Sequence, residues 1–97
     1  MKLEDRSGSV SVTVTAFGIW QMILGTKKLQ VETKGRTLRD LIYALNEVAL
    51  GKLEEEVLRA GHLDEKFKIF VNGKASDMNT TIADADDVLL FSVIDGG

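Results

Sequence analysis

Few side chains in this sequence could carry out catalysis by themselves. His62 is the only histidine, which excludes a metal site built from several histidines and any serine–histidine pair that does not use His62. The sequence has no cysteine, which excludes disulfides, thiolate metal ligands and a cysteine nucleophile. We therefore expect His62 to be an ordinary loop residue.

The acidic side chains form two clusters that are also poor catalytic candidates. Asp84, Asp86 and Asp87 lie in one short turn and offer too few spaced oxygen atoms for a calcium loop, so we interpret them as turn formers. The consecutive glutamates 54–56 point in different directions around a helix, which favours solvent over paired acid–base chemistry. No glycine-rich loop of standard spacing indicates a nucleotide site.

The last residues offer a different kind of reactive group. The stretch "LLFSVIDGG" passes from apolar residues to Asp95 and then to Gly96 and Gly97. Glycine lets a backbone enter a channel that is too narrow for a Cβ, and a carboxylate on an exposed tail is accessible to another enzyme. Disorder is the simpler interpretation of two glycines. We expect residues 95–97 to form a flexible tail, with the Gly97 carboxylate as the candidate reactive group.

The composition is that of one small domain. Its 97 residues allow a single core, and a net charge of -3 argues against a nucleic-acid-binding surface. Residues 49–97 carry five basic and ten acidic side chains, so this half either meets a basic partner or is a solvated face. The start "MKLEDRSGSV" lacks the apolar core of a signal peptide, and the apolar run "AFGIWQMILG" is about half a membrane span. We expect a cytoplasmic protein without membrane contacts.

Two alternating stretches predict a pair of strands in the first third of the chain. In "SVSVTVTAF" the even-numbered residues 10–16 are apolar and alternate with serine and threonine, the period of a half-buried strand. The stretch "KKLQVET" alternates again through Leu29 and Val31. Between them, the apolar cluster of residues 18–25 is expected to close one end of a hairpin.

One amphipathic helix is predicted over "TLRDLIYALNEVALG". Thr37 is an N-cap with Asp40 three residues later, and a glycine follows the last turn. Its apolar positions, three and four residues apart, are Leu38, Leu41, Ile42, Leu45 and Val48. A short second helix up to Gly61 is predicted from Leu53 and Val57, which lie four residues apart.

The remaining elements complete an α+β domain. The strand "FKIFV" leads into Asn72-Gly73, the strongest two-residue hairpin signal, and a short strand is expected near residues 74–82. The last strand, "DVLLFSVI", is apolar on nearly every position, so it belongs in the middle of a sheet or keeps one face for a partner. A hairpin, one main helix and a return to the sheet place the last strand centrally beside the first.

These segments resemble the ubiquitin-like β-grasp sulfur carriers, the MoaD/ThiS family, which includes the small subunit of molybdopterin synthase. The resemblance covers residues 9–97 and rests on "FGIWQMILG", "TLRDLIYAL", "IFVNGK" and "DADDVLLFSVIDGG". It implies a β-grasp fold, in which a mixed sheet of four to five strands packs against one main helix. Residues 1–97 would form a single domain with a polar N-terminal extension at 1–8.

The resemblance also implies a chemistry of the tail. In this family an adenylating enzyme related to ubiquitin-activating enzymes uses ATP and magnesium to adenylate the terminal glycine, here Gly97. Sulfur from a donor protein then gives a thiocarboxylate, which the large subunit of molybdopterin synthase uses to form the dithiolene, with Gly96 passing through its narrow opening. The chain would hold no permanent cofactor and would not be catalytic alone. We expect partner contacts at Phe91, Val93, Ile94, Asp95 and Trp20, with simple burial of the strand as the alternative.

Three departures from the family pattern bear on these expectations. Ala85 stands where the acidic turn usually has glycine, which costs roughly 1 kcal/mol if that position needs a positive φ. Ser92 and Val93 replace the prolines that commonly precede the tail, so the tail loses a preset backbone. Residues 20–22 replace the usual charged residues, which leaves the identity of the partner open.

Two other functions use the same sequence features. A ubiquitin-like protein modifier would join Gly97 to a lysine of a target, and a non-catalytic binding module would not use the tail at all. The thiamine-pathway carriers share the tail but lack an insertion like residues 51–66, so the length of this chain favours the molybdopterin pathway or a related molybdenum or tungsten cofactor pathway.

Overall fold

The computed structural model describes residues 9–93. The predicted extension at 1–8 and the predicted site residues Ile94, Asp95, Gly96 and Gly97 lie outside the described residues. In chain order the elements are β1 (Val10–Ala16), α1 (Ile19–Leu24), β2 (Lys28–Thr33), α2 (Leu38–Val48), α3 (Lys52–Glu56), β3 (Leu58–Arg59), β4 (His62–Leu63), β5 (Phe67–Val71), β6 (Lys74–Ser76) and β7 (Asp87–Ser92).

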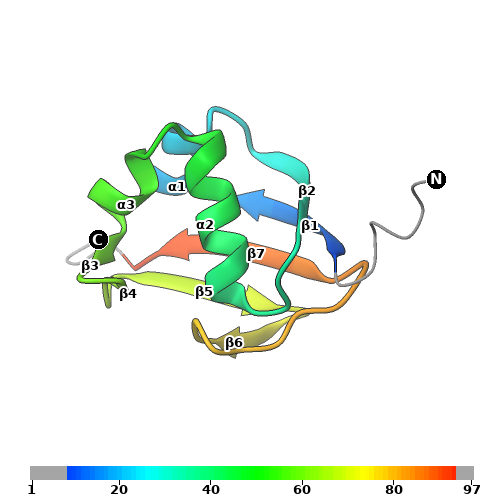
Figure 1. Ribbon diagram of the computed structural model, residues 1–97. Coiled ribbons are helices and arrows are strands. Elements are labelled where there is room, and N and C mark those ends of the chain that lie inside the picture. Colours follow the sequence, from blue (N-terminus) through cyan, green and yellow to red (C-terminus); the bar gives the residue numbers. More distant parts are fainter. Residues whose placement is uncertain (1–8, 94–97) are drawn as a thin grey trace.

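Five of the strands form one mixed sheet in the order β2-β1-β7-β5-β6. Strand β7 runs parallel to β1, with Val14 opposite Val88, and antiparallel to β5, with Ile69 opposite Leu90. Helix α2 crosses one face of this sheet (Figure 1). The predicted α+β architecture, with the last strand central beside the first, is confirmed.

The core lies between α2 and the covered face of the sheet. The even-numbered residues of β1 are all buried, and so are Val88 and Leu90 of β7. The period of two that predicted β1 therefore also decides which side chains meet the helix. The helix contributes Leu38, Leu41, Ile42 and Leu45.

Helix α2 begins as predicted, but its buried stripe continues on a different apolar residue. Thr37 Oγ1 accepts a hydrogen bond from the Asp40 N–H at 3.3 Å, and Asp40 Oδ2 accepts from the Thr37 N–H at 3.1 Å, which completes a capping box. The prediction that Val48 belongs to the buried stripe is wrong, because Val48 is 54% exposed. Ala49, four residues after Leu45, occupies the buried position instead.

Two connections differ from the prediction. The apolar cluster of residues 18–25, expected as the closed end of a hairpin, contains the short helix α1. The second helix, expected up to Gly61, ends at Glu56 and is followed by the hairpin of β3 and β4. Ala60 and Gly61 both have positive φ, 54° and 82°, which is the conformation of a two-residue hairpin turn.

Two further predictions can be compared with the described residues. The expectation of a loop at His62 is wrong, because His62 lies exposed in β4. Asn72 and Gly73 form the predicted turn with φ of 52° and 85°, and they lead into β6. Within residues 9–93, no helix is long and apolar enough to cross a membrane.

Candidate functional site at the end of strand β7

The predicted reactive tail follows strand β7, so the residues around the end of β7 form the candidate site. Two hydrogen bonds from the segment after β1 hold this end. The Phe17 N–H donates to the Leu90 carbonyl at 2.9 Å, and Trp20 Nε1 donates to the Phe91 carbonyl at 3.0 Å. Gly18, between the two donors, has φ 59° and ψ -127°, a backbone conformation that favours glycine and turns the chain from β1 into α1.

Trp20 is a positioning residue and not a direct partner contact. The sequence predicted a partner contact here, but the Trp20 side chain is 0% exposed. Its ring packs edge-on against Phe67, with centroids 5.6 Å apart and an interplanar angle of 79°. A buried indole N–H needs an acceptor, and the Phe91 carbonyl provides it. Trp20 therefore fixes the backbone of β7 next to the tail from inside the core.

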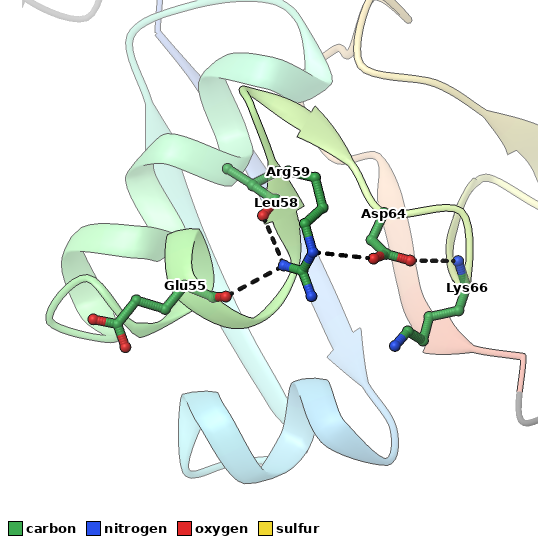
Figure 2. A network of polar contacts seen from close by, with 5 residues as sticks. All are labelled: Glu55, Leu58, Arg59, Asp64 and Lys66. Carbon is green, nitrogen blue, oxygen red and sulfur yellow. Dashed lines mark hydrogen bonds and ion pairs between the residues drawn. The ribbon is translucent and has the colours of Figure 1, made fainter.

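A polar network lies between α3, β3 and the turn that precedes β5 (Figure 2). Arg59 Nη1 donates to the carbonyls of Leu58 at 2.9 Å and Glu55 at 3.3 Å. Its Nε lies 3.4 Å from Asp64 Oδ2, and Asp64 Oδ1 accepts a hydrogen bond from the Lys66 N–H at 3.1 Å. The Arg59 side chain is 56% exposed, so this ion pair contributes little stability. Its effect is to connect α3 and β3 to the turn at residues 64–66.

That turn holds the last described residue of the chain. The Val93 N–H donates to the Lys66 carbonyl at 2.7 Å. Proline has no N–H, so a proline at this position could not make the bond. A hydrogen bond therefore fixes the backbone at Val93, where the sequence comparison had led us to expect a loss of preset backbone.

Phe91 lies on the face of the sheet that α2 does not cover. Its ring is half-buried and packs against Phe70 of β5, with centroids 5.2 Å apart. Leu89, two residues earlier on the same face, is also half-buried and lies opposite Phe70 in the ladder. The two faces of β7 were predicted to be apolar, and they are: Val88 and Leu90 enter the core, while Leu89 and Phe91 remain partly accessible.

In the acidic turn before β7, the carboxylates of Asp84 and Asp86 accept hydrogen bonds from neighbouring residues. Asp84 Oδ1 accepts from the Ser11 N–H at 2.8 Å, and Asp86 Oδ2 accepts from the Ala83 N–H at 2.8 Å. Asp86 Oδ1 also accepts from Asn72 Nδ2 at 2.9 Å. These bonds confirm the interpretation of Asp84 and Asp86 as turn formers, whereas for Asp87 it is wrong, because Asp87 is the first residue of β7. Residues 9–93 contain no group of three or more His, Asp or Glu side chains that could hold a metal ion.

Ala85 in the same turn has the positive φ that the sequence suggested. Its φ is 72°, in the left-handed region that favours glycine. Its N–H donates to the Ser11 carbonyl at 2.7 Å, and this bond holds the turn against the start of β1. The strain at Ala85 therefore lies at the end of β7 that is far from the tail.

The structure brings three of the predicted site residues together at one end of the molecule. Trp20, Phe91 and Val93 all lie at the end of β7, although Trp20 acts from the core. Sequence reasoning missed Lys66 and Phe17, which act through backbone atoms that any residue type carries. Lys66 lies directly before β5 and Phe17 directly after β1. These positions are the one signal in the sequence that could have indicated their role.

The family of the chain follows from a comparison with family models. The model of the ThiS family matches residues 14–97, which include the last three residues of β1, the main helix and all of β7. This chain belongs to the ThiS family. A search of curated proteins gives no match.

Several solved structures have the same fold as this ThiS-family chain. SAMP1 from Haloferax volcanii is 23% identical and superposes with a TM-score of 0.77, covering 90% of this chain and 99% of that chain. A Pyrococcus furiosus protein assigned as molybdopterin converting factor, subunit 1, is 28% identical with a TM-score of 0.72, covering 88% and 99%. A chain of the BexX/CysO complex from Amycolatopsis orientalis is 22% identical with a TM-score of 0.73, covering 89% and 99%.

These comparisons confirm the β-grasp fold and the family that the sequence resembles. The chain is a β-grasp protein of the ThiS family. The BexX/CysO complex shows that a structural neighbour is found together with a second protein.

Proposed function

We propose that this chain is a sulfur carrier that acts as the small subunit of molybdopterin synthase. The carboxyl group of Gly97 is adenylated and then converted to a thiocarboxylate, whose sulfur enters the dithiolene of molybdopterin. The observation that carries the proposal is the anchoring of β7 in the middle of the sheet up to Val93, four residues before Gly97. The fold holds the chain firmly at the point from which those last residues must reach a partner.

The chemistry divides between the tail and two partner enzymes. A Gly97 carboxylate oxygen attacks the α-phosphorus of ATP and displaces pyrophosphate, which gives an acyl adenylate. A hydrosulfide ion supplied by the sulfur donor then attacks the carbonyl carbon, AMP leaves with its electron pair, and loss of the sulfur-bound proton leaves the thiocarboxylate. Splitting the reaction in this way replaces one difficult substitution with two easier ones. ATP and magnesium are held by the adenylating enzyme, so the side chains of this chain supply neither acid nor base.

Two features favour the molybdopterin pathway over the thiamine pathway. The insertion at residues 51–66 is part of the fold, because Leu53, Val57 and Leu58 are buried in the core. The Pyrococcus furiosus neighbour assigned to molybdopterin conversion is 28% identical to this chain. The accessible face of Phe91, Leu89 and Phe70 then offers an apolar docking surface for the large subunit of the synthase.

A protein modifier is the second candidate function. The likeness to SAMP1 of Haloferax volcanii favours it, since SAMP1 is a small archaeal modifier protein and 99% of its chain is covered. In this function the activated carbonyl carbon of Gly97 is attacked by a lysine amine of a target, and an isopeptide bond forms. The tail and the adenylating step are the same in both functions, so only the acceptor differs.

The experiment that separates these functions uses the purified chain with the adenylating enzyme and sulfur donor of the same organism. The thiocarboxylated chain is mixed with the large synthase subunit and the molybdopterin precursor, and dithiolene formation is measured. We expect dithiolene formation with the wild-type chain and none with a chain that lacks Gly96 and Gly97. Lysine-linked conjugates in lysate without dithiolene formation would favour the modifier, and a tail that is never adenylated would leave only a binding module.

A further inference from the structure

Strand β2 lies at an edge of the sheet. Within residues 9–93 it pairs only with β1, in one unbroken register, and its other side is open. The opposite edge strand, β6, has three residues, whereas β2 has six. Proteins commonly protect a sheet edge by a short strand, a proline, a bulge or charged side chains, and of these β2 has only the charges. The arrangement of these charges therefore decides whether the edge repels or accepts another strand.

The backbone of β2 determines which of its residues could pair with a further strand. The Ala16 N–H donates to the Lys27 carbonyl at 2.7 Å, which begins the β1–β2 ladder. Hydrogen-bonded pairs alternate along an antiparallel ladder, so the odd-numbered residues of β2 bond to β1. The exposed, even-numbered residues turn their N–H and C=O groups away from β1: Lys28, Gln30 and Glu32. The Lys28 carbonyl accepts a bond of 3.3 Å from the Thr26 hydroxyl, and a carbonyl oxygen can accept a second one.

One register joins this edge to the same edge of a second copy of the chain. When two β2 strands run antiparallel with Gln30 opposite Gln30, Lys28 of each copy lies opposite Glu32 of the other. Each outward-facing residue then lies opposite another one, so their N–H and C=O groups can form hydrogen-bonded pairs. Opposite charges directly across a strand pair stabilise it, and like charges destabilise it. Strand β2 is therefore complementary to itself.

The neighbouring registers are less favourable. A shift of two residues in one direction places Lys28 opposite Lys34, and a shift of two in the other direction places Lys28 opposite Gln30 without a charge pair. A shift of one residue places outward residues opposite inward ones and exchanges the two faces of the sheet. The positions of the charges on β2 thus select the register with Gln30 on the two-fold axis.

The helix side of the edge has room for the second copy. A hollow of about 410 Å³ lies between β2 and α2, and Thr33 and Tyr43 are among its lining residues. In the self-paired register, Lys27 of the second copy lies opposite Thr33, which is buried on the face that α2 covers. The charged residues of the hollow are three acids and one base: Glu32, Asp40, Glu47 and Lys34. A basic residue of the second copy is thus placed beside a hollow with more acidic than basic residues.

We propose that the free chain forms a two-fold dimer through its β2 strands, which joins two five-stranded sheets into one. Strand β1 lies between β2 and β7, so the dimer leaves the end of β7 uncovered. Neighbouring strands lie about 4.8 Å apart, so the two β7 strands lie about 24 Å apart and run in opposite directions. The chain after Val93 then begins at opposite ends of the joined sheet in the two copies. This proposal does not depend on the proposed function.

Sedimentation equilibrium of the full chain over a concentration series tests the proposal. A strand pair with few side-chain contacts buries less area than a standard interface, so we expect a dissociation constant on the order of 10 to 100 µM. Lys28→Glu places like charges opposite each other twice, and we expect the constant to rise about ten-fold. Lys74→Glu is the matched control, because it reverses an exposed lysine on the other edge strand, β6. We expect it to leave the constant unchanged.

A mixture of two charge variants tests the register itself. Glu32 also interacts within its own chain, so one substitution there does not isolate the contact with a second copy. Lys28→Glu and Glu32→Lys each place like charges opposite each other in a homodimer. In a mixed dimer, both pairs again have opposite charges. We expect the mixture to associate about ten-fold more tightly than either variant alone, with melting curves to show that both variants fold.

Amide hydrogen exchange in the wild-type chain gives a second measurement. The N–H groups of Lys28, Gln30 and Glu32 should exchange rapidly in dilute protein and become protected as the concentration rises. The N–H groups of Leu29 and Val31 bond to β1 and should be protected at every concentration. Exchange at the three outward N–H groups that does not depend on concentration would contradict the dimer.

The other outcomes also overturn the proposal. A wild-type chain that stays monomeric at about 1 mM would leave the edge to a strand of another protein. A chain that dimerises only after deletion of residues 1–8 would show that its own first residues occupy the edge. A dimer that Lys28→Glu does not weaken, or a mixture that associates no better than its components, would use another surface. None of these results bears on the adenylation of Gly97, which is measured separately.

Discussion

The two ends of strand β7 are held in different ways. At its start, the acidic turn uses the side chains of Asp84 and Asp86 to bind neighbouring backbone and Asn72. At its end, the backbone is held by the Trp20 indole and by the Lys66 carbonyl, and the surrounding surface is apolar and exposed.

Under the proposed function, this difference indicates which end of the strand faces a partner. Before β7, the carboxylates of Asp84 and Asp86 accept hydrogen bonds from within the molecule, which gives these two side chains a structural role. The end of β7 is fixed through the core and through main-chain atoms, which leaves the side chains around the tail free to contact another protein. At the end of β7, buried and main-chain groups therefore hold the strand, and the exposed side chains are left for contact with a partner under the proposed function.

The largest expected effect on stability is at Trp20, at the end near the tail. Trp20→Ala removes a fully buried ring that contacts Phe67 and the donor to the Phe91 carbonyl, so we expect a loss of about 3 to 5 kcal/mol in the free energy of unfolding. Urea denaturation measures it. Trp20→Phe keeps most of the ring volume and loses the hydrogen bond, and should cost about 1 to 3 kcal/mol. Wild-type stability in both variants would contradict the anchoring role.

The next effect concerns the start of β7 and comes from Asn72, which lies in the turn between β5 and β6 and bonds to Asp86 and Asp87. Asn72→Ala removes the side chain that donates to Asp86 and accepts from the Asp87 N–H, and it places alanine at φ 52°. We expect a loss of about 2 kcal/mol from the broken hydrogen bonds and the backbone strain. Asn72→Gly also lacks the two hydrogen bonds but relieves the backbone strain. Its free energy of unfolding should therefore lie between those of wild type and Asn72→Ala. Equal stability of the two variants would show that strain contributes nothing.

Ala85→Gly is expected to stabilise the protein. Glycine adopts the observed φ of 72° without a Cβ penalty, which gains about 1 kcal/mol or somewhat less after the entropy of the unfolded chain is counted. The rise in melting temperature measures this gain. Adenylation should remain unchanged, because Ala85 lies at the opposite end of β7 from the tail. A lower melting temperature would contradict the assignment of strain to this turn.

The smallest effect is expected at Val93. Val93→Pro removes the N–H that donates to the Lys66 carbonyl, at a cost of about 1 kcal/mol or less for one hydrogen bond near the surface. Val93→Ala keeps the N–H and controls for the lost side chain. Amide hydrogen exchange in the wild-type chain should show protection at Val93, and free exchange there would contradict the bond.

The sequence predicted the parts of the fold that follow from periodicity and local caps. The alternation in β1, the Thr37–Asp40 capping box and the Asn72-Gly73 turn all have local signals, and all three are confirmed. The hairpin of β3 and β4 was missed because Ala60 gives no turn signal and adopts its positive φ only in the context of the fold. Elements with a local sequence signal could therefore be predicted, whereas the β3–β4 hairpin depends on tertiary packing.

The candidate site was only partly predictable for the same reason. Phe91 and Val93 were predicted as partner contacts because the last strand has more apolar residues than one helix can cover, and they stay predictions. Trp20 was assigned to the surface because an apolar cluster between glycines does not show which of its residues enters the core. The contact of Lys66 with Val93 is a main-chain bond between distant segments, and no residue type indicates it.

The central claim is that partner enzymes carry out the chemistry of this protein on the Gly97 carboxyl group, while the fold positions and presents it. Intact-mass spectrometry tests this most directly, after incubation of the chain with the adenylating enzyme, ATP, magnesium and the sulfur donor. We predict a mass increase equal to the replacement of one oxygen by sulfur, located on the fragment that contains Gly97. An unchanged mass under conditions in which the enzyme activates its own reference carrier would contradict the claim.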